Sequence, residues 1–280
     1  MRANGSLPIR IALLGAPQVT SSDGTRVFPL PRKTLDVLAF LIVNRGRALS
    51  RSAVAYNLFP DDEEEIARGA LRRNLSYLLS SLPEPPSDTP FIVADGKTIA
   101  WNARAPATVD LEDFERAVSE GRNGDAMAIY RGELLPTLYA DWTTAERERL
   151  RAEYHDVLMR ELQRHRSIRQ FDEATAVART LLNDDPWRED VVRLLIAIRY
   201  DAGDRGGALA EYERFAQRLR AEMRTDPMPE TLAIRDAVSR GQRLATSEHF
   251  AASHTTAAGH PQLGLTFRYG RPVERWRVTG

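Results

Sequence analysis

The first hundred residues alternate between two hydrophobic periods. The run "IRIALLG" predicts a strand, and "SSDG" at 21–24 predicts a turn before "TRVFPL". The next run, "PRKTLDVLAFLIVNRG", predicts a helix because Leu35, Leu38 and Ile42 fall on one face. A proline in its first turn suits this start.

Two further helices and a hairpin follow. "SRSAVAYNLFP" predicts a short helix that Ser50 caps and Pro60 stops, and "ARGALRRNLSYLLSSL" predicts a third helix over 67–82. "FIVADGKTIAWN" predicts a β-hairpin that turns at Asp95-Gly96. Strands, three helices and a hairpin are the order of a winged helix-turn-helix domain with an added amino-terminal sheet, which we place at residues 8–105.

After residue 108 the pattern is helical, with predicted helices that include 125–135 and a long one over 143–168. Ala174 and Ala208 lie in similar contexts 34 residues apart, which is the tetratricopeptide period. We therefore expect an all-α, tetratricopeptide-like domain at 108–242 and a flexible tail at 243–280. The fold class is a multidomain, mainly α chain that begins with the winged helix.

A helical wheel divides the third helix into two faces. A narrow apolar stripe consists of Ala67, Leu71, Leu75, Leu78 and Leu82. The opposite face has no acidic residue in the helix body, and its side chains suit a groove lined with phosphates and base edges. We predict that this face binds DNA through Gly69, Arg72, Arg73, Ser76 and Tyr77.

Four more residues are weaker candidates for the same interface. Arg68 and Asn74 flank the apolar stripe, and Arg51 and Lys97 are placed to contact the DNA backbone. The acidic run at 61–65 is expected to start the third helix, where carboxylates favour the positive end of the helix dipole.

Charge and composition narrow the class of protein. The 280 residues have no net charge and no cysteine, which fits a reducing compartment and excludes thiol chemistry. Residues 1–105 contain 13 basic and 10 acidic groups, and residues 106–242 contain 21 and 27, so the two parts suggest different partners. With no signal core and no membrane span in the sequence, we expect a cytoplasmic protein.

The sequence contains no pattern typical of a catalytic or metal site. Two of the five histidines, His155 and His165, lie ten residues apart on one predicted helix, and no HExxH motif occurs. No nucleophile, base and orienting acid are grouped, so we expect no enzyme activity, no metal and no cofactor.

These segments together resemble the bacterial transcriptional activator domain proteins, which include the antibiotic regulatory protein (SARP) group. The resemblance covers about residues 8–242. It depends on "LSRSAVAYNLFPD", "ARGALRRNLSYLLSSL" and "FIVADGKTIAWN" in the first half, and on "YRGELLPTLYADWTTAERERLRAEY", "FDEATAVARTLLNDDPWRED" and "PMPETLAIRDAV" in the second. It implies a response-regulator type winged helix, a tetratricopeptide-like activation domain, binding to direct repeats near promoters, and contact with RNA polymerase.

The chain departs from this family pattern at a few positions. Phe59 stands where many members have Trp, Met223-Arg224 replaces a usual Leu-Gly, and Leu79 or Ser80 replaces an arginine late in the third helix. Larger relatives contain an ATPase module, and the given sequence contains no GxxxxGK[ST] loop.

Two functional hypotheses follow. The first is a sequence-specific regulator, an activator, that inserts helix 67–82 into the major groove of double-stranded DNA. Its helical domain would contact RNA polymerase or assemble into a homo-oligomer. The alternative is a protein-interaction adaptor whose winged helix no longer binds DNA.

Overall fold

The computed structural model describes residues 9–85 and 88–244, and the predicted tail lies outside them except for residues 243 and 244. By internal contacts the chain divides into two units, residues 1–186 and residues 187–280, and each is described by itself. The predicted domain boundaries at 105, 108 and 242 stay predictions.

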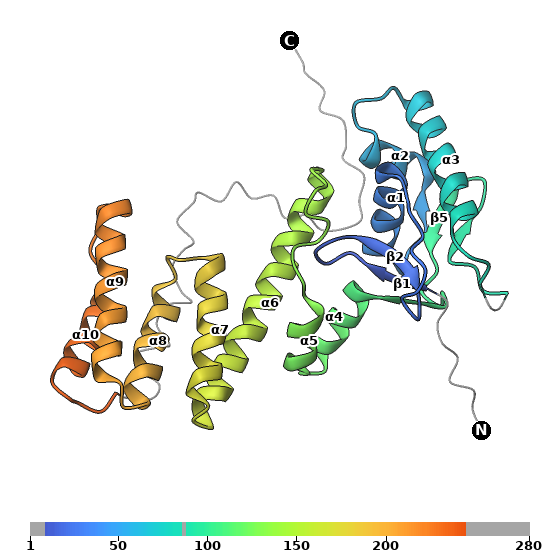
Figure 1. The fold of residues 1–280 in the computed structure, drawn as a ribbon. Coiled ribbons are helices and arrows are strands. Elements are labelled where there is room, and N and C mark those ends of the chain that lie inside the picture. The colour runs from blue at the N-terminus through green and yellow to red at the C-terminus, as the bar shows by residue number, and fades with distance from the viewer. Residues whose placement is uncertain (1–8, 86–87, 245–280) are drawn as a thin grey trace, which may run out of the picture. The chain divides into compact units, whose positions relative to one another are not determined.

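The first unit begins with two small sheets around three helices (Figure 1). One sheet has the order β2-β1-β6, with β2 antiparallel and β6 parallel to β1. The other has the order β3-β5-β4, all antiparallel. The strands are β1 Ile9–Ala12, β2 Gln18–Ser21, β3 Leu49–Ser50, β4 Ile92–Ala94, β5 Thr98–Trp101 and β6 Ala107–Val109, and the helices are α1 Arg32–Val43, α2 Arg51–Leu58 and α3 Glu64–Ser81.

Helices complete both units. In the first unit α6 packs against α5 and α7, and in the second unit α8 packs against α9 and α10. The predicted repeat positions Ala174 and Ala208 are both fully buried, as stacked helices require. The remaining helices are α4 Asp110–Ser119, α5 Asn123–Ile129, α6 Asp141–Ser167, α7 Phe171–Asp184, α8 Glu189–Asp201, α9 Arg205–Met223 and α10 Pro229–Ser239.

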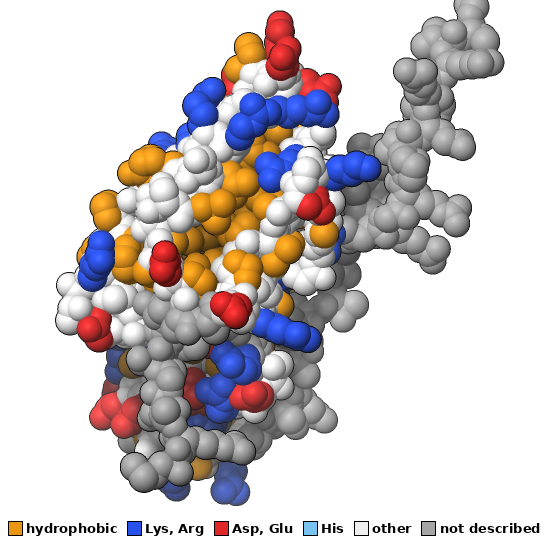
Figure 2. All heavy atoms as spheres, turned by 90° about the vertical axis from the view of Figure 1, so that its right-hand side faces the viewer, with side chains coloured by type: hydrophobic (Ala, Val, Ile, Leu, Met, Phe, Trp, Pro, Cys, Tyr) orange, Lys and Arg blue, Asp and Glu red, His pale blue; other side chains and the backbone are white. Residues whose placement is uncertain are grey.

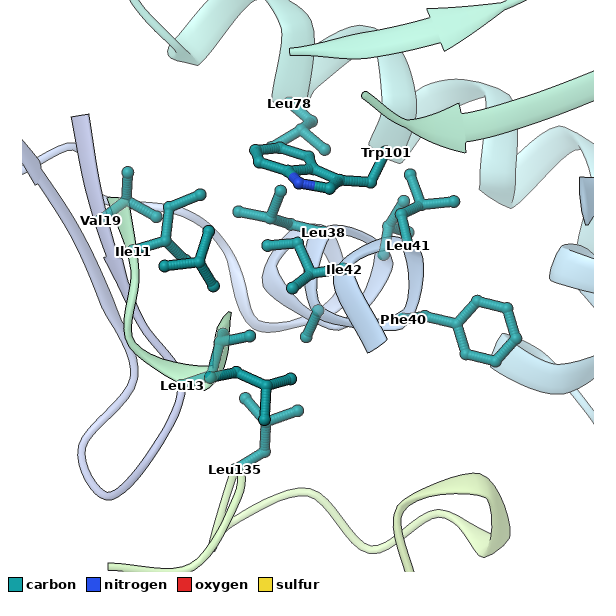
Figure 3. Packing of buried hydrophobic residues seen from close by; sticks show 14 of the residues in the cluster. Ile11, Leu13, Val19, Leu38, Phe40, Leu41, Ile42, Leu78, Trp101 and Leu135 are labelled. Carbon is teal, nitrogen blue, oxygen red and sulfur yellow. The ribbon is translucent and has the colours of Figure 1, made fainter. Parts of the chain in front are cut away.

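Helix α1 lies at the centre of the first core. Figure 3 shows Leu38 and Ile42 of α1 among side chains from the amino-terminal sheet, from α3 and from β5. Phe40 points the other way and meets Trp142 of α6 edge to face, with ring centroids 5.1 Å apart. This helix is therefore buried on both sides.

The predicted short elements of the winged helix are confirmed. Ser50 caps α2, since its hydroxyl accepts a hydrogen bond from the Ala53 N–H at 3.1 Å. The hairpin of β4 and β5 turns at Asp95-Gly96, where the Asp95 carboxylate accepts bonds from the Lys97 and Thr98 backbone N–H groups at 2.7 and 2.5 Å. Helix α3 begins at Glu64, inside the acidic run, as expected.

The prediction of helix over 125–135 is wrong after Ile129. Tertiary contacts override the helical pattern there. Leu134 forms a bridge with Leu14, and the Leu135 N–H donates to the Leu13 carbonyl at 2.9 Å. Leu135 itself has a φ of +48°, which no α-helix allows.

One carboxylate connects the amino-terminal sheet to the helical region. Asp110, the first residue of α4, accepts hydrogen bonds at 2.9 Å from the backbone N–H groups of Leu13 and Leu14, just after β1. Burial raises the pKa of Asp110, while these N–H donors oppose the rise. The bonds join segments about a hundred residues apart in the sequence, next to the β1–β6 pairing.

We expect Asp110→Ala to lower the free energy of unfolding by about 2–3 kcal/mol, because it leaves two N–H groups without an acceptor. Denaturant unfolding of the full chain measures this. Glu148→Ala is the control, since Glu148 is exposed on α6 and pairs with no described residue, and it should change stability by less than about 0.5 kcal/mol. Equal effects of both variants would contradict the assignment.

The hairpin turn gives a pH prediction. Hydrogen bonds from the Thr98 and Lys97 backbone lower the pKa of Asp95. Because the folded pKa lies below the unfolded one, Asp95 stabilises the hairpin above its ordinary pKa of about 3.9, and this contribution is lost as the pH falls through the folded pKa. A carboxyl NMR titration should show this depression, and Thr98→Val, which removes a donor at 3.0 Å, should reduce it. An Asp95 that titrates normally would refute the assignment.

Candidate nucleic-acid interface

Helix α3 has the two faces that the wheel predicts. Its apolar stripe is buried, with Leu71, Leu75 and Leu78 at most 5 % exposed. The stripe packs against α1 and α2. The opposite side of the helix is therefore held toward solvent.

Five side chains on this outer side form a shallow, open hollow. All five are exposed, and four of them are predicted site residues. The set consists of Arg72, Arg73, Ser76, Tyr77 and Ser80. The wheel also places Ser80 outward, and its hydroxyl donates to the Tyr77 carbonyl at 2.9 Å.

The guanidinium groups of the two arginines in the hollow have no partner among the described residues. Arg72 and Arg73 are exposed, and neither forms a hydrogen bond or ion pair with any residue that the structure describes. Gly69 lies beside them, where an added Cβ would stand 3.7 Å from the Arg73 Nη1 atom. The protein itself therefore has room for a methyl group at this position, and the space above Gly69 is open to a ligand.

Two predicted site residues, Arg68 and Asn74, form hydrogen bonds to other residues of the same domain. The Arg68 guanidinium bonds to Glu64 Oε1 and to Ser52 Oγ, both at 2.7 Å. The Asn74 side chain accepts from Thr34 Oγ1 at 2.9 Å and donates to the Ala70 carbonyl at 2.9 Å, so it ties α3 to α1. These two residues hold the helix in position, and only part of their hydrogen-bonding capacity remains.

The hairpin is fastened to the start of α2. Arg51 donates from its backbone N–H to the Lys97 carbonyl at 2.9 Å and from Nε to the Asp95 carbonyl at 2.8 Å. Lys97 is exposed at the turn. The structure thus uses Arg51 to position the wing and leaves Lys97 facing solvent.

Apolar side chains accompany the basic ones. Figure 2 shows the side of the molecule on which α3 lies in Figure 1, with hydrophobic side chains gathered in the middle and Lys and Arg side chains above and beside them. Tyr77 and Leu79 of α3 and Val93 of β4 are 47, 50 and 54 % exposed. Exposed apolar groups beside arginines suit thymine methyl groups and sugar edges.

Two further findings concern metal-ligand groups and membrane-spanning helices among the described residues. Among residues 9–85 and 88–244 no group of three or more potential metal ligands occurs. None of the described helices combines the length and the apolar character that crossing a membrane requires.

Comparisons with known proteins agree with the fold. Residues 102–239 match the bacterial transcriptional activator domain. The structure is similar to that of Mycobacterium tuberculosis EmbR in complex with a low-affinity phosphopeptide, at a TM-score of 0.67 and 24 % identity. The match covers 85 % of this chain and 66 % of that one, so this chain spans just under two thirds of the EmbR chain's length. No curated protein matches the chain.

The match and the structure confirm the resemblance that the sequence motifs indicated, including the winged helix followed by a helical region. The segment at residues 102–239, just under half of the chain, is assigned by this match to the bacterial transcriptional activator domain family.

Proposed function

We propose that the chain is a transcriptional regulator that binds double-stranded DNA sequence-specifically, with α3 in the major groove. The observation that supports this most directly is the outer face of α3, where Arg72 and Arg73 are exposed and pair with no described residue. An arginine without a protein partner loses no existing bond when it binds phosphate or guanine. Membership of a family of transcriptional activators points the same way.

The residues divide into contacting and positioning groups under this proposal. Arg72, Arg73, Ser76 and Tyr77 contact base edges or phosphates, and Lys97 contacts the backbone beside the groove. Arg51, Arg68 and Asn74 act mainly by holding the hairpin and α3 in place, through the hydrogen bonds described above. The exposed acids at 61–65 lie before α3 or in its first turn, and the nearest hollow residue in the sequence is Arg72.

We further propose that the helical region contacts RNA polymerase or mediates self-association. Support comes from the family and from large apolar side chains that are exposed on this region, such as Tyr139, Ile168 and Met228. Transcription in vitro from a promoter fragment that the protein selects should rise when the protein is added. Occupied promoters with unchanged transcript would contradict the activator role.

Arginine replacements test the DNA contact. Fragments selected from genomic DNA by the full chain provide the site, and fluorescence anisotropy measures the affinity. The full chain is needed because β6 and Asp110 both bond to the β1 segment. We expect Arg72→Ala and Arg73→Ala to weaken binding about tenfold each, and the double variant to reduce the salt slope by about 2.

Arg10→Ala is the matched control, because the Arg10 side chain is exposed on β1 and forms no hydrogen bond or ion pair with a described residue. It should leave both affinity and salt slope unchanged. If the double variant binds like the parent, or if no fragment is selected at all, the groove assignment is refuted and the adaptor hypothesis is favoured.

Gly69→Ala separates stability from binding. Alanine fits the protein at this helical position and should raise the free energy of unfolding by about 0.5–1 kcal/mol. It should nevertheless weaken DNA binding, because its methyl group projects where the DNA backbone or base edges approach. Gly124→Ala in α5, with no atom near its added Cβ, is the control that should leave binding intact. Unchanged affinity for Gly69→Ala would show that DNA does not approach this face closely.

A further inference from the structure

A second hollow, of about 320 Å³, lies in the helical part of the first unit. Side chains of α6 and α7 and of the segment between α5 and α6 line it. This size lies within the range of small-molecule sites. The hollow shares no residue with α3 or the hairpin, so the proposed DNA contact does not account for it.

Two tyrosines form one wall of this hollow. The rings of Tyr130 and Tyr154 stack with centroids 4.1 Å apart and planes 12° apart. Phe114 packs against Tyr130 at 5.4 Å between centroids, which fixes the ring. Neither tyrosine hydroxyl bonds to a residue that the structure describes, and both rings are half-buried. The wall is therefore a packed aromatic surface with two hydroxyl groups that have no described hydrogen-bond partner.

Of the two carboxylates that line the hollow, Asp184 has charged or polar partners and Glu133 has no ion-pair partner among the described residues. Asp184 Oδ2 lies 2.7 Å from Arg151 Nε and 2.5 Å from His155 Nε2, so its charge is opposed. The carboxylate of Glu133 is exposed and forms no ion pair with any described residue. Besides His155, the lining contains one cation, Arg151, and two anions, and the Glu133 carboxylate is the anion that no cation pairs with among the described residues.

The pKa of Tyr130 is affected by the same two carboxylates. Burial raises the pKa of Tyr130 to about 12, with smaller contributions from the carboxylates of Glu133 and Asp184. Burial disfavours a charge of either sign, whereas the two carboxylates disfavour a phenolate and favour a positive charge. Aromatic faces attract cations as well, through the ring quadrupole.

We propose that this hollow binds a small organic cation, with its ammonium group between the tyrosine pair and the Glu133 carboxylate. The proposal is independent of DNA binding. The lining segment between α5 and α6 is also hydrogen-bonded to the amino-terminal sheet region, since the Gly15 N–H donates to the Glu133 carbonyl at 2.9 Å. The Gly15 amide is therefore a reporter of occupancy that lies outside the hollow.

Benzylammonium and its neutral counterpart benzyl alcohol are the probes, added to the full chain and followed by amide NMR. We expect benzylammonium to bind saturably below about 10 mM and to shift the amide signals of Gly132, Glu133 and Gly15. Benzyl alcohol should bind at least about fivefold more weakly, because it lacks the charge that Glu133 and the rings attract.

Glu133→Gln should weaken benzylammonium about fivefold and leave benzyl alcohol unchanged. Glu148→Gln, an exposed acid on α6 outside the hollow, should change neither. Equal binding of both probes, no saturable binding, or no effect of Glu133→Gln would overturn the proposal. Benzoate binding in place of benzylammonium would instead assign the hollow to anions at Arg151.

Discussion

Burial of the leucine stripe of α3 decides which side chains this protein presents to its surroundings. Once Leu71, Leu75 and Leu78 pack against α1 and α2, the rotation of the helix about its own axis is set. Turning the helix would expose leucines and bury guanidinium groups, and both changes cost free energy. Arg72 and Arg73 therefore face solvent as a consequence of core packing, and Asn74 strengthens the same orientation through its bond to Thr34.

The amino-terminal sheet packs against α1 of the winged helix and is hydrogen-bonded to the start of the helical region α4–α7. Strand β6 and Asp110 lie inside the segment that matches the activator domain family, yet both bond to the β1 segment at the start of the chain. Arg147 of α6 strengthens this region by donating to the carbonyls of Leu134, Leu135 and Leu138. The winged helix and α4–α7 thus form one contact unit, and a ligand near Glu133 would touch a segment bonded to the β1 end.

Sequence patterns identified the elements whose structure depends on local signals. The Asp95-Gly96 turn, the Ser50 cap and the leucine stripe of α3 are each specified by residues a few positions apart, and each is confirmed. Contacts between distant residues were not predictable in this way. The two-residue strand β3, the parallel partner β6 and the non-helical 130–135 segment depend on pairing with residues about 50 to 120 positions away.

In the candidate site, too, local sequence predicts some features, and contacts between distant residues determine the others. The wheel predicts which residues of α3 face outward, and the structure agrees for Arg72, Arg73, Ser76 and Tyr77. It does not predict that Glu64 and Ser52 hold Arg68, because that depends on how α2 and α3 pack. Nor does it reveal the hollow at Tyr130 and Tyr154, which forms only when the 130–135 segment leaves the helix.

Site-directed cleavage measures whether the outer face of α3 lies against duplex DNA. The chain has no cysteine, so Ser80→Cys provides a unique attachment point for an iron-chelate DNA-cleaving group. We predict cuts inside the selected site from position 80, and none there from the same group on Ala176→Cys in α7. Cleavage from position 176 with none from position 80 would contradict the account.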